Sequence, residues 1–321
     1  MVGEEQSVRP DDLLDRRLVM VTGKGGTGKT TVAAALAWLA PAQGRKTLLC
    51  EVDNQRSTFA PIFGVEAGFE PIRVRENLEL TNVLWEPSLA SFISKIVPVP
   101  KMAKRILAHS GMAKFLDFTP GSREIVTLST LTAHVEDYDL VIVDMPASGH
   151  AFSLLDITRS AMSLFRSGPI RRRAEELRER LVHPESMVVF VSLPEEMVVN
   201  ETLETLEKMS RYELFGAPPA VVLNRAVPPT LTSEERALLT RLSKEPLDEV
   251  QREFVRAGQW EAELETSTEE AHARLAEACS GQAPLLLGPA PPGGNPREVA
   301  RSVASALARA AGMSPRDLQW T

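Results

Sequence analysis

The chain has 321 residues, 43% of them hydrophobic and 25% charged, with a formal net charge of −7. This length and balance predict a globular protein, built as one large α/β domain with or without a helical insertion, and the acidic balance argues against general nucleic-acid binding. There is no uncharged apolar run of about 18 residues, and the charged start (MVGEEQSVRPDDLLDRR) does not fit a signal peptide, so we expect no transmembrane segment and a cytoplasmic location.

The first predicted elements enclose a glycine-rich loop. The apolar run Leu18–Val21 predicts a buried strand, and residues 30–39 (TTVAAALAWL) predict an alanine-rich helix. Between them, residues 23–30 (GKGGTGKT) satisfy the phosphate-loop pattern in the order of strand, loop and helix that this motif requires. The sequence therefore predicts a site for the phosphates of a nucleotide.

Each residue type in the loop suits this task. Glycine leaves the backbone amides bare, and the start of the helix adds its positive end. Lys29 is expected to reach the β- and γ-phosphates, Thr30 to ligate Mg²⁺ and Thr31 to donate to the α-phosphate. The predicted nucleotide-binding residues of the loop are Gly25, Gly26, Thr27, Gly28, Lys29, Thr30 and Thr31.

A second lysine, Lys24, stands inside the same loop. An ordinary phosphate loop needs no lysine there, and beside Gly25 its charge is expected to point away from the nucleotide of its own chain. We therefore expect Lys24 to act across a dimer interface, on the phosphates held by a partner subunit.

Further apolar strands alternate with helix-length segments. The strands are predicted at 18–22, 47–52, 78–84, 140–144, 187–192, 220–224 and 284–287. This alternation predicts a doubly wound, mostly parallel sheet covered on both faces, with ligands at the carboxyl ends of its strands. Asp53, Asp144 and Asn224 each fall at or just past such an end, so three segments are expected to converge on one site. Taken singly, Asp53 also suits a loop acid, Asp144 a helix cap and Asn224 a turn.

Two helical stretches, 85–118 and 151–185, follow strands without adding new ones. We predict that they form an insertion layer on a single domain whose core covers about 16–84, 119–150 and 186–311. Their methionines and other apolar side chains suit adaptable binding of a protein client or partner, whereas packing on one another and on the sheet is the usual fate of apolar helix faces. Both interpretations stay open. These apolar residues include Phe92, Ile93, Ile96, Met102, Ile106, Met112, Phe115, Met162, Leu164 and Phe165.

The remaining features concern the tail and the cysteines. Thr232 and Glu235 have capping-box spacing at the start of a predicted helix over 232–245, and another helix is predicted over 296–311. Cys50 and Cys279 have no near partner and the chain has no CxxC, so we expect neither a disulfide framework nor a zinc clasp within one chain.

Taken together, these motifs resemble the ArsA family of ATPases. The resemblance rests on residues 24–30 (KGGTGKT), 51–53 (EVD), 144–150 (DMPASGH), 193–196 (LPEE) with 201–202 (ET), and 222–225 (VLNR). It covers about residues 16 to 311 and implies a phosphate-loop fold of the deviant Walker A class, with ATP and Mg²⁺ as ligands.

The resemblance also implies roles for single residues. Lys24 is similar to the family's lysine that contacts the nucleotide of the other subunit. Asp53 is similar to the aspartate of the first switch, which positions the attacking water and helps to bind the metal. Asp144 matches the aspartate that holds Mg²⁺ through water, and Gly149 is placed to sense the γ-phosphate. Asn224, with Arg225 beside it, matches the asparagine that reads adenine.

Departures from the family pattern limit the expected function. Residues 53–57 (DNQRS) replace the more common DPAHS of the first switch, and no counterpart exists for the cysteines of arsenite pumps. We therefore expect a Mg²⁺-dependent ATPase rather than an arsenite pump. It is expected to act as a homodimer, or as a heterodimer with a paralogue as in some bacterial relatives, and to couple nucleotide state to a protein client.

Two alternatives stay open. A positioning ATPase similar to MinD and ParA would act on a membrane or DNA surface, but the last residues, 313–321 (MSPRDLQWT), provide only a weak basic tail for it. A regulatory subunit of a heterodimeric ATPase is the other, favoured by the altered first switch.

Overall fold

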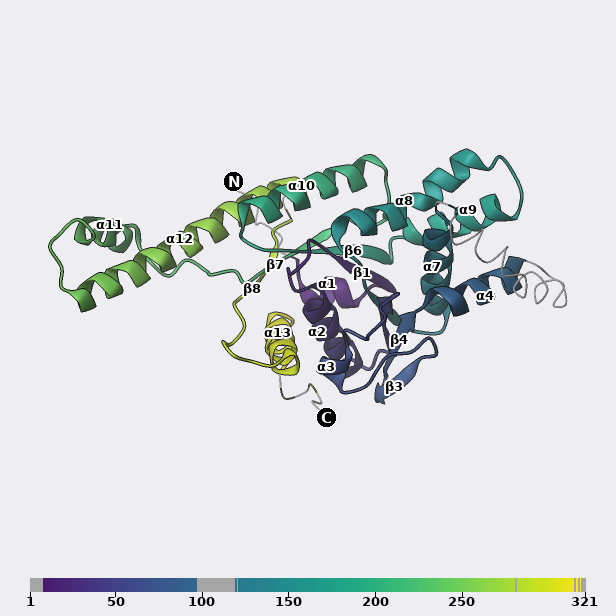
Figure 1. The fold of residues 1–321 in the computed structure, drawn as a ribbon, viewed down its shortest axis with the longest axis horizontal. Helices are drawn as coiled ribbons and strands as arrows, with labels where there is room; N and C mark the ends of the chain where they lie inside the picture. The colour runs from purple at the N-terminus through teal and green to yellow at the C-terminus, as the bar shows by residue number, and fades with distance from the viewer. Residues whose placement is uncertain are drawn as a thin grey trace.

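Within residues 8–96, 119, 121–280, 282–314, 316 and 318, which the computed structural model describes, eight strands form one central sheet (Figure 1). Their order is β3-β4-β2-β5-β1-β6-β7-β8, and all neighbours are parallel except β3 and β4. The strands are β1 (Leu18–Thr22), β2 (Thr47–Val52), β3 (Ile72–Arg75), β4 (Leu78–Val83), β5 (Leu140–Asp144), β6 (Ser186–Ser192), β7 (Ala220–Asn224) and β8 (Leu285–Leu287). This sheet confirms the predicted doubly wound α/β fold.

The central strands are apolar on both sides because both faces of the sheet are covered. Every residue of β1, β5, β6 and β7 is buried. Alternate residues of one strand belong to two different cores: Val19 and Val21 of β1 face one, and Leu18 and Met20 face the other. Continuous apolar runs of this kind are what a parallel sheet between two helical layers requires.

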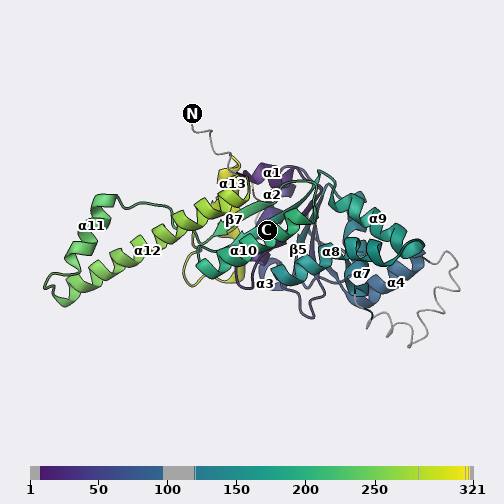
Figure 2. The same cartoon turned by 90° about the horizontal axis from the view of Figure 1, so that it is seen from above.

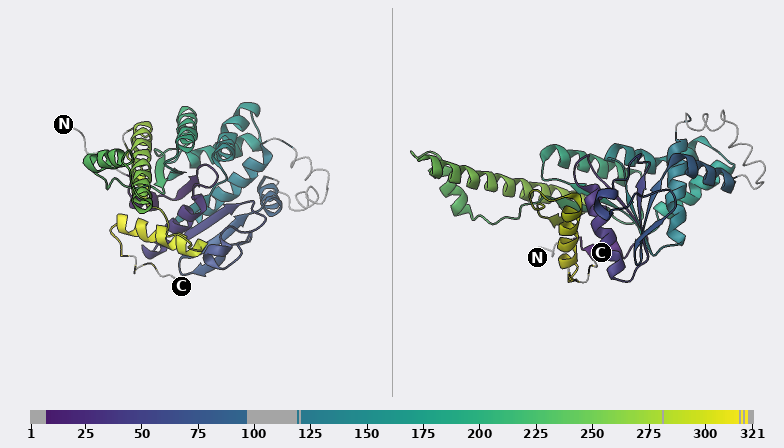
Figure 3. Two further views of the ribbon diagram at one scale, coloured as in Figure 1. Left: turned by 60° about the vertical axis from the view of Figure 1, so that its left-hand side comes forward. Right: turned by 60° about the horizontal axis from the view of Figure 1, so that its bottom comes forward.

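The first layer consists of α1 (Pro10–Leu14), α2 (Lys29–Ala42), α3 (Ala60–Phe63) and α13 (Pro296–Ala310), whose apolar residues share one core. α2 and α13 pack directly on each other. The right-hand view of Figure 3 shows both helices on one side of the sheet, with the second layer on the other side. The small side chains of α2, six of them alanine, let it lie close against the sheet.

The second layer contains α7 (Ser122–Ala133), α8 (Ser148–Leu164), α9 (Pro169–Leu181), α10 (Glu196–Arg211) and the end of α12 (Glu249–Ala278). A 3₁₀ turn, His134–Glu136, leads from α7 toward β5. α4 (Trp85–Ile96) packs on α7, which in turn contacts α8 and α9. We call α4, α7, α8 and α9 the helical layer, and Figure 2 shows it gathered at one end of the molecule.

A helical hairpin extends from the opposite end. α11 (Ser233–Leu242) packs along α12, and together they project well beyond the sheet (Figures 1 and 2). The buried Glu265 carboxylate holds the base of this arm, because it accepts hydrogen bonds from the Thr230 amide at 2.8 Å and from Arg236 at 2.8 Å. The predicted Thr232–Glu235 capping box is present at the start of α11.

The structure differs from the sequence prediction at several elements. β3 was not predicted; it is an antiparallel edge strand with two exposed residues, turning into β4 at Asn77, whose φ is 57°. The 30-residue helix α12 was not singled out either. The insertion over 85–118 is helical over 85–96, and residues 97–118, including Met102, Ile106, Met112 and Phe115, lie outside the described residues. The second insertion divides into α8 and α9 and begins at Ser148 rather than residue 151.

Candidate functional site

The glycine loop joins β1 to α2 as predicted. Gly23, Gly26 and Gly28 have φ values of 147°, 84° and 96°, a region that side-chain-bearing residues rarely adopt. A Cβ added at Gly25 or Gly26 meets no atom within 4 Å, so the space over these two residues is open. The loop thus leaves backbone amides accessible at the positive end of a 14-residue helix, an arrangement suited to phosphate oxygens.

Lys29 and Thr30 begin α2 and meet the end of β5. Thr30 Oγ1 donates to Asp144 Oδ2 at 2.6 Å, and Lys29 Nζ donates to the carbonyl oxygen of Lys24 at 3.1 Å. The pairing of β1 with β5, in which Val21 lies beside Asp144, brings these residues together. Burial lowers the pKa of the Lys29 ammonium, an effect that the nearby Asp144 and Glu201 carboxylates oppose.

Asp144 is a buried carboxylate, and one of its two oxygens has no hydrogen-bond partner. Burial raises its pKa to about 6, while the Thr30 hydrogen bond and the Lys29 charge act in the opposite direction and Glu51 raises it further. Glu51 is its register partner on β2 and is completely buried. Among the described residues, Asp144 Oδ1 and Glu51 Oε1 are buried without a hydrogen-bond partner. Two such oxygens beside a phosphate loop suit a hard cation or its bound water.

Lys24 forms an ion pair within its own chain. Its Nζ lies 3.3 Å from Glu201 Oε2 on α10, and both side chains are about one-third exposed, at 35% and 38%. Glu201 also accepts a hydrogen bond from the Ser148 hydroxyl at the start of α8, and the Ser148 amide donates to the Gly23 carbonyl at 3.1 Å. The Lys24 side chain is thus directed toward α8 and α10 by a carboxylate near the surface.

Asp53 was predicted to join Thr30 and Asp144 at a metal site. It follows β2, as expected, with a left-handed φ of 49°. Its carboxylate, however, contacts the helical layer: Oδ2 lies 3.2 Å from Arg123 Nη1, and Oδ1 accepts from the Trp85 amide at 3.4 Å. The Asp53 side chain is 46% exposed. Its role at the metal stays a prediction.

The remaining predicted site residues differ in how deeply they are buried. Asn224 is buried under it, where its side-chain nitrogen donates to the Thr27 carbonyl at 2.8 Å and its oxygen accepts from the Arg225 amide at 3.0 Å. Arg225 and Gly149 are exposed, and a Cβ added at Gly149 meets nothing within 4 Å. Thr31 lies half-buried in the first turn of α2. Adenine recognition by Asn224 therefore stays a prediction, beside an observed contact that supports the loop.

Two contacts of this site were not predicted from the sequence. Glu201 carries part of the family resemblance, but its position against Lys24 depends on how α10 packs. Arg123 belongs to no motif, and it meets Asp53 across 70 positions of the chain. The sequence did point to Glu51, because it belongs to the acidic cluster at residues 51–53. Its place beside Asp144 follows from the pairing of β2 with β5.

We expect alanine at Gly23 and at Gly25 to have different effects. A Cβ at Gly23 would lie 2.2 Å from the Val191 carbonyl oxygen, so Gly23→Ala is expected to lower the free energy of unfolding by about 2–4 kcal/mol. Gly25→Ala has open space and is expected to cost under about 1 kcal/mol, yet its methyl group obstructs the phosphates and should weaken nucleotide binding at least about tenfold. Denaturant unfolding and titration with a fluorescent nucleotide measure both. Wild-type affinity in Gly25→Ala would contradict phosphate binding at this loop.

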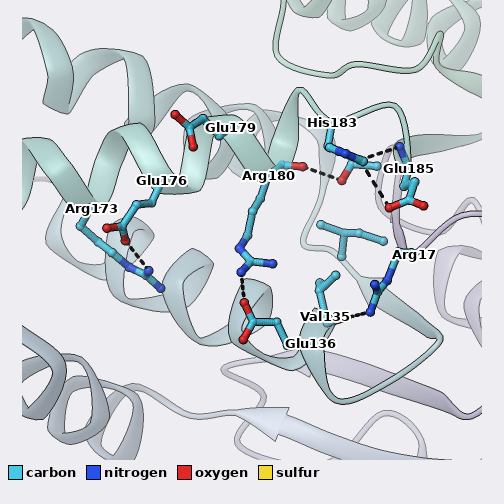
Figure 4. Close-up of a pocket in the computed structure, with 11 residues that line it drawn as sticks. Arg17, Val135, Glu136, Arg173, Glu176, Glu179, Arg180, His183 and Glu185 are labelled. Carbon is cyan, nitrogen blue, oxygen red and sulfur yellow. Dashed lines mark hydrogen bonds and ion pairs between the residues drawn. The ribbon is translucent and has the colours of Figure 1, made fainter.

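A separate cavity lies at the amino-terminal ends of β1 and β6, opposite to the strand end that carries the glycine loop. It has a volume of about 410 Å³, and Figure 4 shows Arg17, Arg180 and His183 at its wall together with carboxylates such as Glu136 and Glu185. Arg180 pairs with Glu136, and Arg17 donates to the Tyr138 carbonyl at 3.2 Å. Most of its charges are thus paired, and it does not include the residues of the glycine loop.

Two kinds of feature are absent from the part of the chain that the structure describes. No helix there has the length and apolarity needed to cross a bilayer. No cluster of three or more His, Cys, Asp or Glu side chains is arranged there to hold a metal by protein ligands alone.

Comparison with known proteins places this site in a family. Residues 16–167 match the family model described as anion-transporting ATPase (ArsA). ATPase BagA of Mycobacterium tuberculosis (strain H37Rv) is 31% identical over 264 residues, which cover 78% of this chain and 75% of that protein. A protein of Aquifex aeolicus (strain VF5) whose name describes an arsenical pump-driving ATPase is 23% identical over 272 residues, covering 74% and 90%.

A eukaryotic relative matches a shorter part. The ATPase ASNA1 homolog 2 of Paramecium tetraurelia is 27% identical over 140 residues, 43% of each chain. The identity to BagA over three quarters of both chains, together with the matching family model, decides the assignment. The chain belongs to the ArsA family of ATPases and hydrolyses ATP.

Proposed function

We propose that this ATPase is a Mg²⁺-dependent dimeric switch that couples its nucleotide state to the capture and release of a protein client or partner. The observation that carries the proposal is the contact of Thr30 with Asp144 at 2.6 Å, next to the partly buried Lys29 and below open loop amides. A cation, a hydroxyl and a carboxylate around a phosphate loop are the groups that phosphoryl transfer needs.

The residues present fit a magnesium ion. Thr30 Oγ1 and Asp144 are hard oxygen donors, and the unpartnered Asp144 Oδ1 has capacity left for a metal-bound water. Glu51 Oε1 adds a second buried oxygen to the same region. When bound, Mg²⁺ neutralises charge that develops on the phosphates.

The chain's own groups divide the remaining work. Lys29 holds the β- and γ-phosphates, Thr31 donates to the α-phosphate, and the amides of residues 25–28 surround the phosphate oxygens. Asp53 positions the attacking water, Gly149 senses the γ-phosphate, and Asn224 with Arg225 reads the adenine. Lys24 leaves Glu201 and reaches the nucleotide of the partner subunit. Its partly exposed ion pair supports this role, because such pairs contribute at most about 1 kcal/mol and open easily.

The helical layer is the proposed place of client binding. Leu164 and Phe165, at the end of α8, are 77% and 41% exposed, whereas Ile93 of α4 is buried. Packing thus accounts for part of the predicted apolar surface and leaves another part available to a partner. α8 begins at Ser148, which donates hydrogen bonds to the Glu201 carboxylate and to the Gly23 carbonyl. The first turn of α8 therefore contacts both the glycine loop and the carboxylate that pairs with Lys24 in the same chain.

An arsenite-pumping function is not part of the proposal. Cys50 is completely buried, and burial raises the pKa of both thiols, that of Cys279 to about 11. Thiolates are the soft ligands that a metalloid prefers, and neither cysteine supports one at neutral pH.

A complementation experiment tests the dimeric site. Lys24→Ala and Asp53→Asn are each expected to lose nearly all ATP turnover as homodimers, and turnover of the wild type should rise with protein concentration. In a mixed dimer one site keeps its own Asp53 and receives the partner's intact lysine. An equal mixture should therefore recover about a quarter of wild-type activity, since roughly half of its dimers are mixed and each contains one intact site.

The control is Lys208→Ala, which removes an exposed lysine of α10 that pairs with Glu204 and should leave turnover unchanged. Folded variants that stay inactive when mixed would contradict catalysis by Lys24 in trans. Wild type that binds ATP but turns it over at no concentration would contradict the homodimer and leave the heterodimer.

A further inference from the structure

Asp53 is held by the first turns of two helices of the helical layer. Its Oδ1 accepts from the backbone amide of Trp85, where α4 begins, and its Oδ2 pairs with Arg123 near the start of α7. The Arg123 guanidinium also lies over the Trp85 ring, 5.0 Å from its centroid. The left-handed backbone at Asp53 turns the chain at the end of β2, where its carboxylate reaches these two helices.

This arrangement fixes the direction of a carboxylate that is assigned to a water molecule, because each of its oxygens has a contact and both contacts come from the helical layer. A general base needs an oxygen within hydrogen-bond reach of the proton it accepts. With Oδ2 on a guanidinium and Oδ1 on an amide, the Asp53 carboxylate is engaged elsewhere. A carboxylate oxygen can accept more than one hydrogen bond, so what must change is the direction of the side chain. Hydrolysis in which Asp53 turns to a water beside the phosphates requires at least one of these contacts to open.

We propose that Arg123 is a positioning residue that withholds Asp53 from the attacking water, and that opening of the Asp53–Arg123 contact couples hydrolysis to movement of α4 and α7. We call the contact of Asp53 with Arg123 and Trp85 the latch. This inference rests on the proposed role of Asp53 in hydrolysis.

The exposure of the latch makes it reversible. The Arg123 and Asp53 side chains are 49% and 46% exposed, and water screens ion pairs of this kind so that they bias an equilibrium only slightly. Losing the pair is therefore expected to raise the fraction of released Asp53 about two- to fivefold. A nucleotide that contacts the first switch can exceed such a bias.

The latch also has a route to the rest of the helical layer. α4 packs on α7, and α7 packs on α8 and α9. When Asp53 leaves, the start of α4 loses a hydrogen-bond acceptor for the Trp85 amide, and Arg123 loses its contact with the Asp53 carboxylate. The indole of Trp85, stacked under the same guanidinium, reports the change optically.

The first experiment measures ATP turnover of Arg123→Met. We expect kcat to rise about two- to fivefold with KM for ATP unchanged, because Asp53 is freed while the phosphate site is untouched. Arg123→Lys keeps a cation for Asp53 and should stay within about twofold of wild type. The matched control is Arg159→Met on α8: Arg159 likewise pairs with a carboxylate, Asp156, and lies over a ring, Tyr212, but none of these residues contacts the site.

The second experiment uses the emission of Trp85, taken as the difference between wild type and Trp85→Phe because the chain has four tryptophans. ATP with Mg²⁺ is expected to change this difference signal in wild type. In Arg123→Met the signal should already resemble the ATP state and respond little to ATP. Thermal unfolding of each variant separates these effects from a loss of fold.

Each result supports or overturns the proposed role of the latch. Asp53→Asn without turnover, combined with an unchanged rate in Arg123→Met and a silent Trp85, would overturn the latch and leave the proposed function standing. Full turnover in Asp53→Asn would overturn both. A rate that falls in Arg123→Met and returns in Arg123→Lys would mean that Arg123 supports the active arrangement, which also overturns the withholding role. If Arg123→Met does not fold, the Trp85 response of wild type and of Arg123→Lys decides.

Discussion

Lys29→Ala is expected to lower kcat/KM for ATP by about 10²–10³-fold. Lys29 begins α2 directly after the loop, and its ammonium lies partly buried near the Asp144 and Glu201 carboxylates. Alanine removes the cation that faces the β- and γ-phosphates, and it leaves the two carboxylates without this countercharge, so phosphate is repelled where it was attracted.

The measurement is steady-state turnover with a coupled phosphate assay, accompanied by nucleotide titration and thermal unfolding. Lys208→Ala, which removes an exposed lysine from α10, is the matched control and should keep wild-type kinetics. Lys29→Ala that folds normally and turns over ATP at the wild-type rate would refute the assignment of this loop to catalysis.

The parts of the fold that sequence predicted are those set by local pattern. The loop of residues 23–30 follows from glycine conformations and from an apolar strand beside an alanine-rich helix, and both are local properties. The buried parallel strands appear as continuous apolar runs because two layers cover them. β3 has no such run, since two of its four residues are exposed and β4 is its one strand neighbour in the sheet of the described residues.

The local sequence pattern did not predict the directions of the side chains at the site. The sequence predicted that the loop and Asp144 share the carboxyl edge of the sheet. Thr30 and Asp144 meet there because β1 and β5 are neighbours, a strand order that the structure supplies. The direction of Asp53 depends instead on Arg123 and on the start of α4, contacts made by helices whose packing the sequence does not encode locally. The same is true of Lys24, whose partner Glu201 belongs to α10.

Asp144→Asn is expected to stabilise the metal-free protein while it abolishes Mg²⁺-dependent hydrolysis. Burial raises the pKa of Asp144 from its usual value of 3.8 to about 6, so the folded state binds this proton more tightly than the unfolded state does. The stability that belongs to this group is complete below about pH 4 and is lost as the pH rises through about 6. At pH 7.5 the buried charge then costs about 1–3 kcal/mol, which asparagine does not incur while it still accepts from Thr30.

Denaturant unfolding of both proteins without Mg²⁺, at pH 4.5 and 7.5, measures this difference, which should be small at the lower pH and grow at the higher one. Asp248→Asn is the control, because asparagine caps α12 as well as aspartate does and should change stability by under about 0.5 kcal/mol at either pH. If the stability difference between the two proteins does not depend on pH, burial does not raise the pKa of Asp144. With ATP and Mg²⁺ present the order should reverse, since only the wild-type carboxylate gains from the cation. A charge that destabilises the resting protein and is compensated by its ligand is the property expected of a residue kept for the reaction rather than for the fold.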